Sequence, residues 1–123
     1  MKYIMIIDDS VTIRSTIKLV VKDLGYAIME AENGKDALDK ITEIKNSGND
    51  VALCIVDVNM PIMDGLKFVE EFKKADQFTP ILMLTTESQE SLIEEAKKLG
   101  ASGWIIKPFQ PSKLIETIKK IVK

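Results

Sequence analysis

Polar side chains follow four of the apolar runs in this 123-residue sequence, at the point where each run ends. Asp8 and Asp9 follow the first run, Asp57 follows a later one, and Thr85 and Lys107 follow the last two. If these runs are strands of one parallel sheet, their carboxyl ends lie along one edge, where open α/β sheets bind ligands. Three carboxylates, a hydroxyl and an ammonium group would then converge in one shallow cleft.

Such a group of carboxylates predicts a cation. Three carboxylates about 5 Å apart repel one another by roughly 3 kcal/mol per pair at an effective dielectric constant near 20. Either one of them takes up a proton or a cation lies among them, and oxygen ligands favour Mg²⁺, or Mn²⁺ in its place, over zinc. Beside a metal and a lysine, the Asp57 carboxylate is placed as a nucleophile for phosphorus.

Each of these residues also has a simpler interpretation. Asp8 and Asp9 precede a helix that they could cap, and Asp57 could form an ordinary turn. Thr85 alone is typical of a strand, and Lys107 alone of a solvated strand end. Because all of these signals fall at the same ends of four strands, the joint pattern favours a functional site.

The composition excludes several other kinds of site. The chain has no histidine, one cysteine (Cys54) and one arginine (Arg14), so it cannot form a Ser/His/Asp triad, an imidazole metal site or an intramolecular disulfide. A net charge of −2 argues against nucleic acid as a partner. No apolar stretch approaches the ~20 residues that span a bilayer, so no membrane association is expected and a cytoplasmic location is predicted.

Apolar periodicity predicts the elements that position these residues. Strands are predicted where the apolar residues are nearly continuous: Tyr3 to Ile7, Ala27 to Met29, Val51 to Val56, Ile81 to Leu84 and Trp104 to Ile106. Helices are predicted where apolar residues recur at helical spacing: Ile13 to Leu24, Ala37 to Ile44, Leu66 to Phe72, Leu92 to Leu99 and Leu114 to Val122. Gly25 and Gly100 are typical of helix ends, and Pro111 of a helix start.

This strict alternation predicts an α/β fold with right-handed crossovers and helices on both faces of one sheet. The two shorter apolar runs suit the edges of the sheet, and the three richer runs suit its middle. We therefore expect a doubly wound, five-stranded parallel sheet with strand order 2-1-3-4-5. One domain covers residues 1–123, because there is no linker, repeat or low-complexity tract.

The motifs resemble those of a known family. Asp8-Asp9, Asp57 in VDVNMPIMDG, Thr85 in PILMLTTE and Lys107 in GWIIKPF are similar to the landmarks of bacterial response regulator receiver domains. The resemblance extends over essentially the whole chain and is closest to the stand-alone, CheY-like receivers of chemotaxis. It implies the flavodoxin/CheY-like (βα)5 fold and a role in two-component signalling.

The resemblance implies a phosphoacceptor and a metal site. Asp57 would accept a phosphoryl group from a phosphohistidine on a sensor kinase of the CheA type. Asp9, Asp57 and the backbone carbonyl of Asn59 would hold Mg²⁺, with Asp8 assisting through water. Phosphorylation and dephosphorylation would be self-catalysed, without turnover of an external substrate. The missing histidine fits this reading, because the histidine belongs to the partner.

The resemblance also implies a switch. Lys107 would pair with the phosphoryl group and Thr85 would bond to it, while the Lys107-Pro108 peptide is cis in many relatives. The shift of Thr85 would let Trp104 turn inward and change the surface formed by the fourth helix, the fifth strand and the fifth helix. Position 104 is usually tyrosine or phenylalanine. Thr86 stands where many chemotaxis regulators have alanine, and its bulk is expected to hinder the attacking water or the phosphodonor.

The leading hypothesis is a monomeric phosphoacceptor switch whose output is protein binding, because the sequence ends at the fifth helix with no effector domain. Its target would be the flagellar motor switch or a relay protein. A single-domain phosphorelay intermediate and a small phosphatase with Asp57 as nucleophile stay open, although the sequence Asp57-Val58-Asn59 lacks the Asp-X-Asp spacing of haloacid-dehalogenase-like enzymes. An FMN module is disfavoured, since two aspartates stand where its phosphate would bind.

Overall fold

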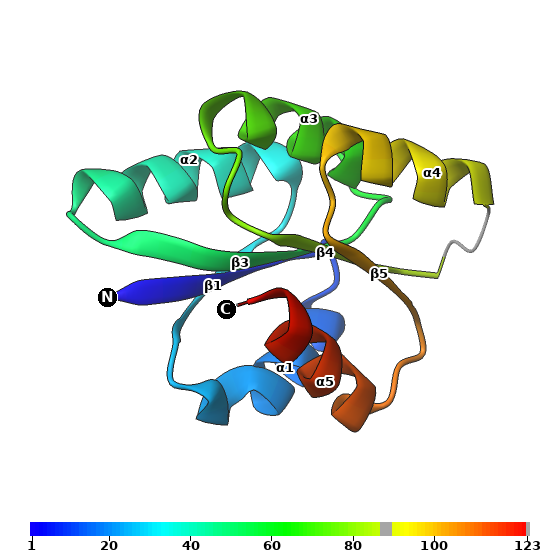
Figure 1. Ribbon diagram of the computed structural model, residues 1–123. Coiled ribbons are helices and arrows are strands. Elements are labelled where there is room, and N and C mark those ends of the chain that lie inside the picture. Colours follow the sequence, from blue (N-terminus) through cyan, green and yellow to red (C-terminus); the bar gives the residue numbers. More distant parts are fainter. Residues whose placement is uncertain (87–89, 123) are drawn as a thin grey trace.

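The described residues of the chain form five strands and five α-helices that alternate along the sequence (Figure 1). The computed structural model describes residues 1–86 and 90–122. The elements, in chain order, are β1 (Lys2–Ile7), α1 (Val11–Val21), the 3-10 helix η1 (Lys22–Leu24), β2 (Ala27–Ala31), α2 (Gly34–Asn46), β3 (Asp50–Val56), α3 (Gly65–Ala75), β4 (Ile81–Thr85), α4 (Glu90–Leu99), β5 (Gly103–Ile106) and α5 (Pro111–Ile121).

All the strands pair in parallel, in the order β2-β1-β3-β4-β5. Helices α2, α3 and α4 cover one face of the sheet, and α1 and α5 cover the other (Figure 1). Each face has its own hydrophobic core: Phe68, Phe72 and Ile41 pack on the first face, and Ile17, Leu114 and Ile118 on the second. The predicted α/β architecture and strand order are confirmed.

Burial explains why the central strands were the easiest to predict. Residues 4–7 of β1 and 81–85 of β4 are buried on both faces of the sheet, so they read as continuous apolar runs. The prediction for β2 was too short: it ended at Met29, whereas the strand continues to Ala31. Glu30 interrupted the apolar run, and an edge strand tolerates such a residue because one side faces solvent.

Helix capping does not use the two aspartates after β1. The N-cap of α1 is Ser10, whose hydroxyl accepts a hydrogen bond from the Ile13 N–H at 3.2 Å. Asp8 accepts instead from the backbone N–H of Ser10, at 2.9 Å. The capping interpretation of Asp8 and Asp9 was therefore wrong, and both carboxylates stay at the carboxyl end of β1.

The predicted helix boundary signals are confirmed. Gly25 follows η1 with a φ of 91°, and Gly100 follows α4 with a φ of 112°, both in the left-handed region that favours glycine. Pro111 begins α5. Within the described part of the chain, no helix has the length and apolar character required to cross a membrane.

Candidate functional site

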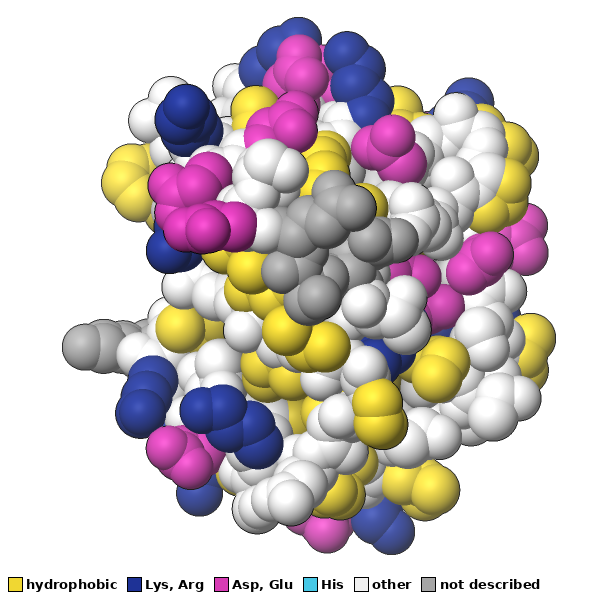
Figure 2. Space-filling model, turned by 90° about the vertical axis from the view of Figure 1, so that its right-hand side faces the viewer, with side chains coloured by type: hydrophobic (Ala, Val, Ile, Leu, Met, Phe, Trp, Pro, Cys, Tyr) yellow, Lys and Arg dark blue, Asp and Glu magenta, His cyan; other side chains and the backbone are white. Residues whose placement is uncertain are grey.

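The parallel sheet brings the predicted site residues to one edge. Asp8 directly follows β1, Asp57 directly follows β3, Thr85 ends β4 and Lys107 directly follows β5. These strands run in the same direction, so their carboxyl ends lie together on the right-hand side of Figure 1, the side that Figure 2 shows from the front. Residues separated by up to 99 positions in sequence thereby come into contact.

Three carboxylates form the centre of the site. Asp8, Asp9 and Asp57 each offer an oxygen atom, and these oxygens lie within 4.8 Å of one another. Asp8 and Asp57 are buried, with exposed fractions of 2% and 9%, whereas Asp9 is exposed. An all-oxygen donor set that is open on one side suits Mg²⁺, which retains several water ligands. The residues present therefore fit a divalent cation of this kind.

Lys107 is the basic residue of this cluster. Its Nζ atom lies 2.9 Å from Asp8 Oδ2 and 3.6 Å from Asp57 Oδ2, and its side chain is only 11% exposed. One ammonium group cannot balance three carboxylates, so an excess of negative charge stays at the edge of the sheet. The site can accept a cation and, beside Lys107, an anionic group that the cation helps to neutralise.

Asp57 is held rigidly by its own surroundings. Its Oδ1 atom accepts a hydrogen bond from the Val58 N–H at 2.8 Å, and its backbone N–H donates to the Ile7 carbonyl at 3.0 Å. The pKa of Asp57 is raised above its usual value, chiefly because the group is buried. The Lys107 charge and a hydrogen bond with the Thr85 side chain lower this pKa, and the Asp8 charge raises it. A carboxylate in these conditions is poorly solvated and therefore nucleophilic.

The loop after β3 passes very close to Asp57, which the sequence prediction missed. The Gly65 N–H donates to the Val58 carbonyl at 2.8 Å, and a Cβ atom at Gly65 would lie 2.0 Å from the Asp57 carbonyl oxygen. Only glycine fits there. Ile62, in the same loop, has a φ of 67° and is exposed. The Asp64-Gly65 pair was a turn signal that could have pointed to this close approach.

The other predicted residues lie at the rim of the cluster or outside it. Asn59 is exposed and lies two residues after Asp57, while Thr86 is exposed beyond the end of β4. The Lys107-Pro108 peptide is cis, as expected. The roles of Asn59 and Thr86 stay predictions, whereas the contacts of the three aspartates, Thr85 and Lys107 place those side chains together.

Trp104 is the predicted switch residue. It is half-buried on β5, in register with Met83 of β4, and packs against the core beneath α4. With Ile93 and Phe109 it lines a largely apolar groove of about 630 Å³ between α4, β5 and the start of α5. Figure 2 shows hydrophobic side chains gathered near the middle of the viewed face.

Comparison with known proteins confirms the resemblance seen in the sequence. The response regulator receiver domain model matches residues 4–119. The chain is 33% identical to the chemotaxis protein CheY of Thermotoga maritima, over 99% of this chain and 98% of the relative. It is 35% identical to CheY1 of Helicobacter pylori, over 97% of this chain and 95% of the relative.

A solved structure of CheY4 from Vibrio cholerae matches the fold with a TM-score of 0.88 at 37% identity, and the match covers 99% of both chains. A receiver domain protein from Methanospirillum hungatei matches with a TM-score of 0.86 at 27% identity, over 98% of this chain and 92% of that one. Fold, site geometry and sequence similarity agree, and the chain belongs to the response regulator receiver domain family, with CheY-like proteins among its relatives.

Proposed function

We propose that this chain is a phosphoacceptor switch of a two-component system, with residues 1–123 acting as one receiver domain and Asp57 as the acceptor. The observation that carries the proposal is the juxtaposition of three carboxylates within 4.8 Å and a lysine 3.6 Å from Asp57. The phosphodonor is a phosphohistidine of a sensor kinase, as expected for relatives named as chemotaxis proteins. The phosphorylated form then changes its binding to a target protein.

The transfer is a substitution at phosphorus. An oxygen of the Asp57 carboxylate attacks the phosphorus atom, a P–O bond forms and the P–N bond of the phosphohistidine breaks. The imidazole nitrogen keeps the electron pair and takes up a proton. In the dephosphorylation step, water attacks the phosphorus atom, inorganic phosphate leaves and the Asp57 carboxylate is restored.

Different residues of the chain are proposed to bind the metal ion, bind the phosphoryl group and orient the attacking carboxylate. Asp9, Asp57 and the Asn59 carbonyl are proposed to hold Mg²⁺, with Asp8 acting through water. When bound, the cation neutralises charge on the phosphoryl oxygens. Lys107 binds a phosphoryl oxygen from the other side, and the rigid contacts of Asp57 keep its attacking oxygen in place.

The output follows from the position of Thr85 at the end of β4. The buried Thr85 hydroxyl already bonds to the Asp57 carboxylate, and a phosphoryl group there adds negative charge and acceptor oxygens farther from the strand, which draw the hydroxyl outward from its resting position. The space that Thr85 vacates lets Trp104 shift, and the groove lined by Ile93 and Phe109 changes shape. We therefore propose the surface of α4, β5 and α5 as the binding surface, with the flagellar motor switch as the target in a chemotaxis pathway.

Phosphoryl uptake from acetyl phosphate tests the acceptor. With Mg²⁺ present, intact mass spectrometry should detect one added phosphoryl group on the wild type and on Asp39→Asn, a control for an exposed aspartate on α2. Asp57→Asn should gain none. Equal uptake by Asp57→Asn would overturn the assignment, and uptake that persists when Mg²⁺ is chelated would overturn the proposed metal dependence.

Two measurements separate the alternatives. Steady release of inorganic phosphate from small phosphate esters, over many turnovers, would replace the switch with a phosphatase. Beryllium fluoride with Mg²⁺, which mimics a phosphoryl group, should change the fluorescence of Trp104, the one tryptophan of the chain. An unchanged spectrum at saturation would contradict the coupling between Asp57 and the α4, β5 and α5 surface.

A further inference from the structure

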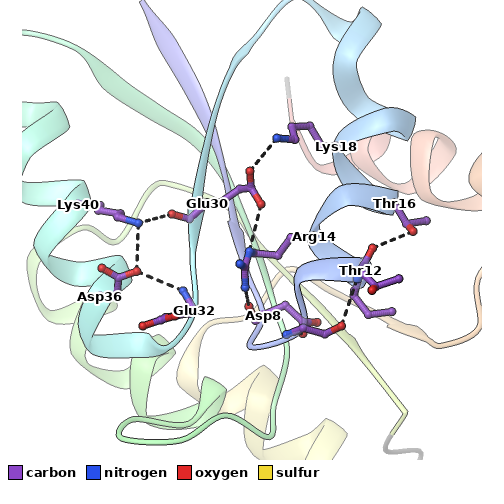
Figure 3. Close-up of polar contacts among 11 residues, drawn as sticks. Asp8, Thr12, Arg14, Thr16, Lys18, Glu30, Glu32, Asp36 and Lys40 are labelled. Atoms are coloured by element: carbon purple, nitrogen blue, oxygen red, sulfur yellow. Dashed lines mark hydrogen bonds and ion pairs between the residues drawn. The ribbon is translucent and has the colours of Figure 1, made fainter.

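Arg14, the single arginine of the chain, connects α1 to the backbone of the acidic site. One guanidinium nitrogen, Nη1, donates a hydrogen bond to the Asp8 carbonyl oxygen, and Nε lies 3.1 Å from Glu30 Oε1 on β2 (Figure 3). The Arg14 side chain is only 13% exposed. A largely enclosed, planar group with two partners on different elements has little freedom to reorient.

Glu30 is itself held firmly. Its other carboxylate oxygen lies 2.8 Å from Lys18 Nζ, and its backbone carbonyl accepts a hydrogen bond from Lys40 at 2.7 Å (Figure 3). The hydrogen bond from Lys18 lowers the pKa of Glu30, burial opposes this, and Arg14 lowers it further. Glu30 is therefore a stable anionic anchor, and it fixes the end of the guanidinium that does not touch Asp8.

Arg14 completes the immobilisation of Asp8. The Asp8 N–H donates to the Ala31 carbonyl at 3.0 Å, Oδ1 accepts from the Ser10 N–H at 2.9 Å, and Oδ2 lies 2.9 Å from Lys107 Nζ. The carbonyl that Arg14 binds belongs to the peptide that joins Asp8 to Asp9. The orientation of this peptide determines the direction in which the Asp8 and Asp9 side chains leave the backbone. The single contact of Arg14 with the Asp8 carbonyl therefore affects two of the three carboxylates.

We propose that Arg14 is a positioning residue that orients Asp8 and Asp9 for cation binding, acting through the Asp8-Asp9 peptide and anchored by Glu30. The inference rests on the proposed metal site, since the orientation matters for that site. Electrostatics alone argues for the opposite effect. A positive charge near three carboxylates weakens cation binding, so the loss of Arg14 should strengthen binding if the residue acted only through its charge.

This difference in sign makes the proposal testable by Mg²⁺ titration in a calorimeter. Arg14→Met removes the charge and the contacts, whereas Arg14→Lys keeps the charge but cannot hold two partners with a planar fork. Positioning predicts that both variants bind Mg²⁺ about ten-fold more weakly, the usual effect of losing a residue that orients metal ligands. Lys18→Met, the control, removes a charge from the same Glu30 but leaves the contact with Asp8, and should not weaken binding.

Tighter binding by Arg14→Met with unchanged binding by Arg14→Lys would overturn the proposal and leave a purely electrostatic role. Unchanged binding by both variants would overturn it as well. Thermal unfolding of each variant shows whether it folds. If Arg14→Met does not fold, Arg14→Lys alone decides.

A second measurement needs no metal and so does not depend on the proposed function. The Ser10 amide donates to Asp8 Oδ1 and thus reports the orientation of that carboxylate. In the metal-free protein, Arg14→Lys should shift the Ser10 amide resonance and raise its hydrogen exchange rate about ten-fold, while Lys18→Met leaves both unchanged. An unmoved Ser10 amide in Arg14→Lys overturns the positioning role, whereas a wild type that fails to bind Mg²⁺ overturns the metal site and leaves the amide result to judge Arg14.

Discussion

Lys107 pairs with Asp8: its Nζ atom lies 2.9 Å from Asp8 Oδ2, and both side chains are buried. The distance from the same Nζ atom to Asp57 Oδ2 is longer, 3.6 Å. In this arrangement the lysine balances part of the negative charge of the three carboxylates. It would also compete with the proposed metal ion for Asp8, so we expect Lys107 to oppose cation binding in the unphosphorylated protein.

This opposition predicts the effect of Lys107→Met. Loss of a unit charge about 5 Å from a bound divalent cation in a water-like dielectric should raise Mg²⁺ affinity more than about ten-fold. Phosphoryl uptake from acetyl phosphate should fall, because the ammonium group proposed to bind a phosphoryl oxygen is gone. Calorimetry and intact mass spectrometry measure the two effects, with Lys35→Met, from an exposed pair on α2, as the control. Weaker Mg²⁺ binding by Lys107→Met would contradict the competition.

Ile62 has a strained backbone. A φ of 67° is unfavourable for a β-branched residue. Because the side chain is 80% exposed, its packing contributes little free energy to offset this strain. Ile62→Gly should therefore raise the free energy of unfolding by about 1 kcal/mol, as measured by urea denaturation. Ile62→Val, which keeps the branched Cβ, should leave it unchanged. A less stable Ile62→Gly variant would show that the isoleucine side chain makes a stabilising contact.

Gly65 and Gly34 form a matched pair near the site. A Cβ at Gly65 would lie 2.0 Å from the Asp57 carbonyl oxygen, which is backbone, whereas one at Gly34 would meet the flexible side chain of Met63 at 2.7 Å. Gly65→Ala should lower the free energy of unfolding by about 3 kcal/mol and also weaken Mg²⁺ binding, because Asp57 must move. Gly34→Ala should lower the free energy of unfolding by less than Gly65→Ala does, and should leave Mg²⁺ binding intact. Equal effects on binding would contradict this assignment.

Asp76 controls the acid stability of the opposite end of the fold. Burial acts to raise its pKa, but hydrogen bonds from the Thr79 hydroxyl and N–H, from Lys45 and from the Phe78 N–H hold it well below its usual value of 3.8. The stability that it adds is present above pH 3.8 and is lost as the pH falls toward the lower folded-state pKa.

Asp76→Asn should therefore lower the free energy of unfolding by about 2 kcal/mol at pH 7, and the difference should shrink below pH 4. Urea denaturation across this range measures it, and Asp39→Asn, in an exposed pair, serves as the control. A difference that stays constant with pH would show that the Asp76 charge contributes nothing.

The sequence was sufficient to predict the sheet and the clustered residues because both depend on local patterns. Buried central strands such as β3 read as continuous apolar runs, and a parallel sheet must bring their ends together. The contacts of Arg14 could not be predicted, and the Asp64-Gly65 pair indicated a turn but not how closely Gly65 approaches Asp57. They depend on the path of the loops and on the pairing of side chains from different elements, which no periodicity encodes.

The end of β2 also shows that a local pattern predicts the buried part of an element but not its contacts with other elements. An apolar pattern locates the buried part of an edge strand and ends at its first charged residue, Glu30. The structure shows why a charge is stable there: Arg14 and Lys18 both bind it. Glu30, at which the predicted strand ended, is therefore the residue that pairs with Arg14.

Chemical trapping of the phosphorylated residue is the most direct test of Asp57 as the phosphoacceptor. After incubation with acetyl phosphate and Mg²⁺, borohydride reduces an aspartyl phosphate to homoserine, and tandem mass spectrometry of the peptides locates the converted residue. We predict homoserine at position 57, none at Asp8 or Asp9, and none when Mg²⁺ is chelated before the reaction. Homoserine at Asp8 or Asp9, or a phosphorylated protein with an unconverted Asp57, would contradict it.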